Sequence, residues 1–226
     1  MFFWDSTMLV VLPALLLTFY AQWKLSSTFS HFSGVGTRSG LTGAQAAAAL
    51  ARRRNLGVGI EPTGGSLTDH YDPTTNVLRL SEPIYNERSI AAVGVAAHEL
   101  GHALQKADNY GPLTLRMGLV PLVNFSSSAS WILFLIGLFA HLPGLLWAGI
   151  AAFSLAVLFS LITLPVEFDA SRRALVALRE DGIITSQEEP GVRSVLNAAA
   201  LTYVAAALMA VLQLLRLVLI ARNSDD

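Results

Sequence analysis

The chain has 226 residues, of which 53% are hydrophobic and 14% charged, and it contains no cysteine. Because soluble domains usually carry about 25% charged residues, this composition indicates a membrane protein. The lack of cysteine excludes disulfides and thiolate metal ligands. A net charge of −1 gives no reason to expect nucleic acid as a partner.

Four stretches of the chain carry almost no charge and are long enough to cross a bilayer, which takes roughly 20 apolar residues in a helix. Asp5 precedes the first stretch without any basic residue, and no small-residue cleavage site follows, so we expect an anchor and not a cleaved signal. Residues 141–144 supply turn chemistry between the second and third stretches. The predicted membrane-spanning helices cover residues 6–23, 117–140, 145–166 and 194–219.

The polar segment between the first two spans is predicted to form a small α+β domain. Thr42 and Gln45 have the spacing of a capping box at the start of an alanine-rich helix. Ser89 is expected to cap a later helix. The predicted elements are a helix from Thr42 to about Asn55, a strand at 58–61, hairpin strands at 67–72 and 77–80, and a helix from Ser89 to about Lys106.

The later helix contains the sequence His98-Glu99-Leu100-Gly101-His102, an HExxH pattern. Positions i and i+4 share one face of a helix, so both imidazoles can point at one ion. Glu99 is offset by about 100° and can hydrogen-bond a metal-bound water without being a ligand. Because zinc lowers the pKa of such a water to about 7, a carboxylate beside it can act as general base. The pattern therefore predicts a catalytic Zn²⁺ site.

A catalytic zinc usually has three protein ligands, and two residues compete to be the third. Asp108 lies six residues after His102, as in extended motifs in which a glycine bends the chain, but Gln105 stands where that glycine is needed. Glu167 directly follows the third span and lies two spans from His102, so both residues are on the same side of the bilayer. We favour Glu167 over Asp108.

Four segments together resemble the membrane-bound neutral zinc metallopeptidases of the YugP type: LTDHYDP (67–73), LRLSEPIY (78–85), AAHELGHALQ (96–105) and LPVEFDASRRAL (164–175). The resemblance implies a zinc-dependent endopeptidase in which His98, His102 and Glu167 bind the metal and Glu99 is the base. The chain is more distantly similar to HtpX-type membrane peptidases, whose glutamate motif ends in aspartate. Ser171 occupies that position here, so the carboxylate that orients a ligand is either Asp169 or missing.

A peptidase must also hold an extended substrate and stabilise an oxyanion. The predicted strand at 77–80 could offer a sheet edge for the substrate. His70 is our first choice of oxyanion donor, with a purely structural role in the hairpin as the equal alternative. The other candidate donors are Tyr71, Tyr85, Arg172 and Arg173.

The expected protein is a mainly α membrane protein with about four spanning helices and a small zincin-like domain. Its predicted parts are a first membrane helix (1–23), the catalytic segment (24–116), a membrane hairpin (117–166), a cytoplasmic segment with the third ligand (167–193), and a last membrane helix and tail (194–226).

Lysine and arginine are concentrated in the two polar segments. Nine of the fifteen lie between Lys24 and Arg116, and four lie between Arg172 and Arg193. Because positive residues favour the cytoplasmic side, we expect a multi-pass protein of a bacterial inner membrane with its active site facing the cytoplasm.

The leading hypothesis is a membrane-embedded zinc endopeptidase that cleaves proteins or peptides, with a role in membrane protein quality control. The alternatives are a site-2-type intramembrane protease and a metal-binding scaffold without catalysis. The presence of Glu99 speaks against the scaffold. A regulatory partner and the oligomeric state are left open by the sequence.

Overall fold

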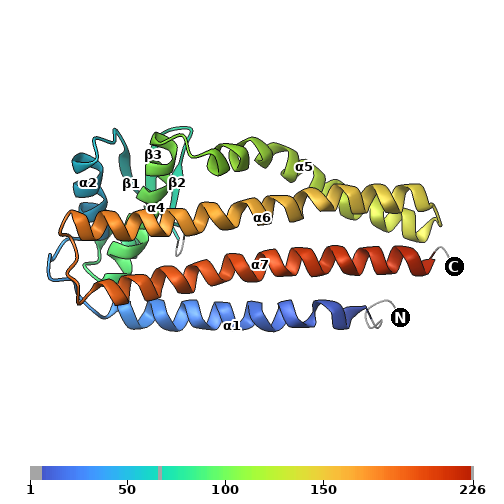
Figure 1. Cartoon of the computed structure of the whole chain (residues 1–226), viewed down its shortest axis with the longest axis horizontal. Coiled ribbons are helices and arrows are strands. Elements are labelled where there is room, and N and C mark those ends of the chain that lie inside the picture. Colours follow the sequence, from blue (N-terminus) through green and yellow to red (C-terminus); the bar gives the residue numbers. More distant parts are fainter. Residues whose placement is uncertain (1–6, 66–67, 225–226) are drawn as a thin grey trace. The chain divides into compact units, whose positions relative to one another are not determined.

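The computed structural model describes residues 7–65 and 68–224 and is mainly helical, with one small sheet (Figure 1). Within these residues, four helices are long and apolar enough to cross a membrane, which confirms the four predicted spans. Each helix extends beyond the uncharged run that predicted it. The four are α1 (Met8–Ser33), α5 (Gly111–Phe139), α6 (Pro143–Glu180) and α7 (Glu189–Ser224).

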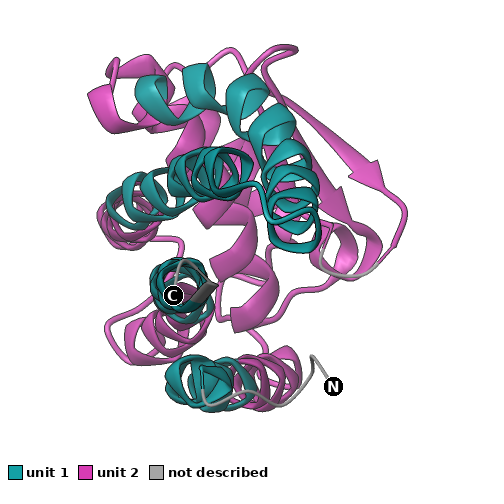
Figure 2. Cartoon of the chain, turned by 90° about the vertical axis from the view of Figure 1, so that its right-hand side faces the viewer, with its two compact units in different colours: residues 1–21, 114–165, 202–226 teal, residues 22–113, 166–201 magenta. Residues whose placement is uncertain are grey.

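The chain divides into two compact units (Figure 2). Unit 1 comprises residues 1–21, 114–165 and 202–226, and unit 2 comprises residues 22–113 and 166–201. Helices α1, α5, α6 and α7 each contribute residues to both units, although only the first turn of α5 belongs to unit 2. The candidate site lies wholly in unit 2.

Unit 1 contains a tightly packed helical hairpin of α5 and α6. A Cβ atom on Gly137 would lie 2.3 Å from the backbone nitrogen of Leu146, and one on Gly149 would lie 2.7 Å from the backbone nitrogen of Phe134. Small residues let membrane helices approach to backbone contact in this way. The turn at the end of the hairpin places His141 at a φ of 53°.

Unit 2 contains a three-stranded sheet with the order β1-β3-β2, formed by β1 (Gly59–Thr63), β2 (His70–Asp72) and β3 (Val77–Ser81). Strand β2 pairs antiparallel with β3, which confirms the predicted hairpin, although Leu67 of the expected strand lies outside the described residues. The prediction that the strand at 77–80 is an edge is wrong. Strand β1 pairs in parallel with the other side of β3, so the edges of the sheet are β1 and β2.

The helices of unit 2 begin as their capping residues predict. Helix α2 (Gly43–Arg53) starts with a capping box, in which Gln45 N donates to Thr42 Oγ1 and Thr42 N donates to Gln45 Oε1. Helix α4 (Ile90–Ala107) starts at Ser89, whose Oγ accepts a hydrogen bond from Ala92 N. A short helix, α3 (Glu82–Asn86), was not predicted and follows β3 directly.

Helix α4 lies inside the core of unit 2. Its Leu100 is fully buried, and the side chains that share its cluster come from α2, β3 and the second half of α6. Burial of each such side chain contributes roughly 1.5–3 kcal/mol to folding. The HExxH helix is therefore held rigidly by protein on several sides. The other fully buried leucines of this cluster are Leu50, Leu78, Leu80 and Leu178.

Candidate metal centre

Two helices supply the predicted metal ligands. Helix α4 carries His98 and His102 one turn apart, and α6 carries Glu167, two residues after Pro165. The imidazole Nε2 atoms of His98 and His102 lie 3.2 Å and 3.6 Å from Glu167 Oε2. One ligand atom of each residue lies within 4.8 Å of the other two. The structure thus brings Glu167 to two histidines that are distant from it in sequence.

The donor set fits a zinc ion. Two imidazole nitrogens and one carboxylate oxygen converge on one point, and this is the ligand chemistry of catalytic zinc sites that keep a position open. The Glu167 side chain is only 2% exposed. Burying an ionised carboxylate is costly unless a positive group compensates its charge, so the location of Glu167 favours a cation at this point.

The electrostatics of His102 agree with this reading. Burial lowers the pKa of its imidazole, but the contact with the Glu167 carboxylate and the negative charge of Glu99 more than offset that effect. As a result, the pKa of His102 lies above its ordinary value. The space between the three side chains therefore stabilises positive charge.

The outward-facing nitrogen of each imidazole also has a partner. His98 Nδ1 lies 3.1 Å from the hydroxyl of Ser171, and His102 Nδ1 lies 3.0 Å from Gln105 Oε1. Both rings are therefore held at Nδ1 by protein and present Nε2 to Glu167. Such contacts orient metal ligands in many sites.

Glu99 is placed beside the three ligand residues by a different element. It is 9% exposed, and its Oε2 accepts a hydrogen bond of 3.0 Å from the backbone nitrogen of Tyr71 in β2. Hydrogen bonds to a charged carboxylate are stronger than neutral ones. The edge strand of the sheet thus fixes the orientation of Glu99.

The two helices can approach this closely because Gly101 has no side chain. A Cβ atom at this position would lie 2.4 Å from the carbonyl oxygen of Ala170. The backbone of α4 therefore contacts the backbone of α6 three residues after Glu167. The glycine inside the HExxH motif is a packing requirement of the site.

Asp108, the alternative third ligand, is not brought to the site. It is the C-cap of α4, its side chain is 62% exposed, and it forms an ion pair with Arg173. Arg173 also stacks over Tyr110, with its guanidinium carbon 5.6 Å from the ring centroid. This pairing ties the end of α4 to α6 and directs Asp108 away from the histidines.

The predicted oxyanion donors lie in different surroundings. The His70 side chain is exposed, and its Nδ1 lies 2.8 Å from the carbonyl oxygen of Thr68. Arg172 and Arg173 both bond to Asp169. The Tyr71 hydroxyl donates to Asn76 Oδ1 within the hairpin.

Two contributors to the site were missed from the sequence. The backbone N–H of Tyr71 was missed because it depends on how the sheet packs against α4. In the sequence, Gln105 was used only to argue against Asp108, because it stands where the extended motif needs a glycine. Its spacing of i+3 from His102, which places the two on one helix face, was the available signal.

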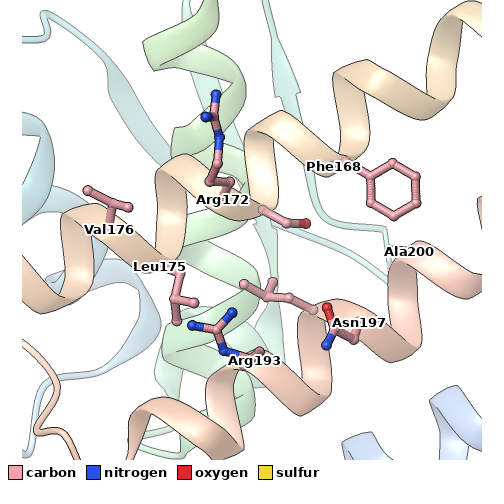
Figure 3. A pocket seen from close by; sticks show the side chains of 9 residues that line it. Phe168, Arg172, Leu175, Val176, Arg193, Asn197 and Ala200 are labelled. Atoms are coloured by element: carbon pink, nitrogen blue, oxygen red, sulfur yellow. The ribbon is translucent and has the colours of Figure 1, made fainter.

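A cavity of about 220 Å³ lies between α6 and α7 within unit 2 (Figure 3). Its wall includes Ser171, so it meets the site on the Nδ1 side of His98, whereas Nε2 faces Glu167. The two arginines of its wall form ion pairs: Arg172 with Asp169, and Arg193 with Glu189. The remaining wall residues are Phe168, Leu175, Val176, Leu196, Asn197 and Ala200.

Comparison with known proteins gives two matches over nearly the whole chain. Residues 7–222 match the model of a family described as "Putative neutral zinc metallopeptidase". The chain is 50% identical over 218 residues to a Bacillus subtilis (strain 168) protein named "Putative membrane protease YugP". The alignment covers 96% of this chain and 97% of that protein. No solved structure matches the chain.

The substitution Gly101→Ala should separate the two helices at the site. The added methyl group would meet a backbone carbonyl, which cannot move aside as a side chain could. We expect a loss of about 1–3 kcal/mol in the free energy of unfolding and a reduced zinc content per chain, measured by denaturant unfolding and elemental analysis.

Gly94→Ala is the matched control on the same helix. Its Cβ would lie 3.4 Å from a side-chain methyl of Val192, which is ordinary contact, and alanine favours a helix by roughly 1 kcal/mol over glycine. Equal zinc content in the two variants would contradict the packing role of Gly101.

Proposed function

The chain belongs to the neutral zinc metallopeptidase family, and on that premise we propose that it is a membrane-embedded zinc endopeptidase. The observation that carries the proposal is the convergence of His98, His102 and Glu167 on one point, with Glu99 held beside them. His98, His102 and Glu167 are proposed to hold the ion. When bound, zinc polarises a carbonyl and makes water a better nucleophile at neutral pH.

Glu99 is proposed as the general base. Tyr71 N–H donates to its Oε2, so Oε1 is the oxygen assigned to proton transfer. It takes a proton from the water that attacks the peptide carbonyl and passes it to the amine nitrogen as the C–N bond breaks. The fixed hydrogen bond to β2 limits the rotation of the carboxylate during this transfer.

The substrate is proposed to bind as an extended chain along β2. This strand pairs only with β3 in the described sheet, and the N–H of Tyr71 already reaches Glu99. An added peptide strand would lie beside Glu99 and would pair with backbone groups of β2 other than the Tyr71 N–H, which Glu99 already occupies. His70 remains our proposed oxyanion donor. Its Nδ1–H donates to the carbonyl oxygen of Thr68, so Nε2 can donate to the oxyanion only when the ring is doubly protonated, as the imidazolium.

The chain is a multi-pass membrane protein, and we propose that unit 2 faces the cytoplasm at a bacterial inner membrane. The support is the positive charge in both polar segments of the sequence. The proposed substrates are exposed segments of misfolded or membrane-associated proteins, which would give the enzyme a role in membrane protein quality control.

The intramembrane alternative receives less support from the packing of α4. This helix contacts α2, α3 and the strands β2 and β3 as well as the parts of α6 and α7 that belong to unit 2. A helix that cleaved substrates inside the bilayer would be surrounded by membrane-spanning helices alone. The packing of α4 therefore favours peptide-bond hydrolysis outside the hydrocarbon core.

The substitution Glu99→Gln should abolish turnover and leave zinc in place. General-base catalysis contributes about 10²–10⁴-fold to rate, so cleavage of an unfolded protein such as casein should fall by at least 10²-fold. Glu87→Gln, an exposed acid outside the site, should cleave at the wild-type rate. Undiminished cleavage by zinc-loaded Glu99→Gln would rule out Glu99 as the base.

The proposed orientation can be tested with single cysteines, because the chain has none of its own. Thr74→Cys lies in the turn between β2 and β3, and Leu142→Cys lies in the turn between α5 and α6. In intact spheroplasts, a membrane-impermeant maleimide should label Leu142→Cys at once and Thr74→Cys only after permeabilisation. The opposite labelling would reverse the orientation.

A further inference from the structure

Gln105 is a fully buried amide on the same face of α4 as His102. Burying an amide without hydrogen bonds costs several kcal/mol, and Gln105 has partners on both of its ends. Its Nε2 donates to the carbonyl oxygen of Val166 at 2.7 Å and to Asp169 Oδ2 at 3.0 Å. Its Oε1 lies 3.0 Å from His102 Nδ1.

These partners determine which way the amide points. A backbone carbonyl oxygen can only accept a hydrogen bond, and so can an ionised carboxylate. Asp169 also accepts hydrogen bonds from Arg172 and Arg173, and the Val166 carbonyl by itself already requires a donor from Gln105. The NH₂ group of Gln105 must therefore face α6, and its oxygen must face His102.

The orientation of the amide in turn determines the tautomer of His102. An amide oxygen can only accept, so the hydrogen of the neutral imidazole must be on Nδ1. The lone pair is then on Nε2, the nitrogen that faces Glu167. A histidine with this tautomer is ready to bind a metal without moving a proton.

We propose that Gln105 is the positioning residue of the metal centre, an inference that rests on the proposed function. One amide holds His102 in its metal-binding tautomer and bonds to Val166 and Asp169, which flank Glu167 in α6. Gln105 therefore links Asp169 to His102 by one hydrogen bond at each end of its amide. A single side chain thus orients the ligand of α4 by direct contact and holds the residues on either side of the ligand of α6.

The tautomer of His98, the other ligand histidine, is not determined by the partner of its Nδ1. Its Nδ1 contacts the hydroxyl of Ser171, and a hydroxyl can either donate or accept. Ser171 is therefore compatible with both tautomers of His98. Of the two Nδ1 partners, only Gln105 therefore determines which nitrogen of its histidine is free to bind the metal.

The test is the zinc affinity of the full-length protein in detergent, measured by competition with a chelator. Gln105→Met has a similar shape but no hydrogen bonds to His102 or α6. Loss of the contact that orients a metal ligand typically lowers metal affinity by about 10–100-fold, and we expect a loss in this range.

Two further variants separate positioning from packing. Leu178→Val removes a buried methylene from the core of unit 2, away from the ligands, so it should melt at a lower temperature and bind zinc as the wild type does. Gln105→Glu can still accept from His102 Nδ1 but cannot donate to both partners on α6. It should lose thermal stability yet bind zinc more tightly than Gln105→Met.

The outcomes distinguish this inference from the proposed function. Wild-type protein that binds no zinc, or binding that survives His102→Ala unchanged, would overturn the proposed function. Binding that depends on His102 but is as tight in Gln105→Met as in the wild type would overturn the inference alone. Zinc affinities that follow melting temperature across all the variants would show that Gln105 acts only in packing, and this too would overturn the inference.

Discussion

The candidate metal centre depends on backbone contact between α4 and α6 at Gly101 and Ala170. A side chain at position 101 would lie 2.4 Å from a carbonyl oxygen, so only glycine allows the two helices to meet there. Glu167 is one turn away from this contact on α6, and the histidines flank Gly101 on α4. Without that contact, the carboxylate could not lie 3.2 Å from one imidazole and 3.6 Å from the other.

Three of the four chemical groups of the site are held by an element other than their own, and the fourth, His102, is held by Gln105 of the same helix. His98 is held by Ser171 of α6, Glu99 by the backbone of β2, and Glu167 by the two histidines of α4. Fixed geometry of this kind is what a catalytic centre needs, because small displacements of the reacting groups are costly in rate. The same long helix, α6, contains a predicted membrane span and the proposed third ligand, so the anchor of the protein is also part of its site.

The sequence predicted those features that arise from short-range patterns. The capping residues Thr42 and Ser89 fixed the starts of two helices, and uncharged length predicted the four spans. Glu167 was preferred to Asp108 by an argument from topology and from the missing glycine at Gln105, and the structure brings Glu167 to the histidines. Contacts between segments that are far apart in the sequence could not be predicted in this way. The parallel addition of β1 places β3 in the centre of the sheet, and the contact between Tyr71 and Glu99 depends on how that sheet packs against α4. Neither follows from local periodicity.

The central claim is that Glu167 completes a zinc site with His98 and His102, and the most direct test is the zinc content of purified protein by elemental analysis. The wild type and Asp108→Ala should each contain one zinc per chain, whereas Glu167→Ala should contain little. Full occupancy in Glu167→Ala together with loss in Asp108→Ala would move the third ligand to the end of α4. A wild type without zinc would contradict the account as a whole.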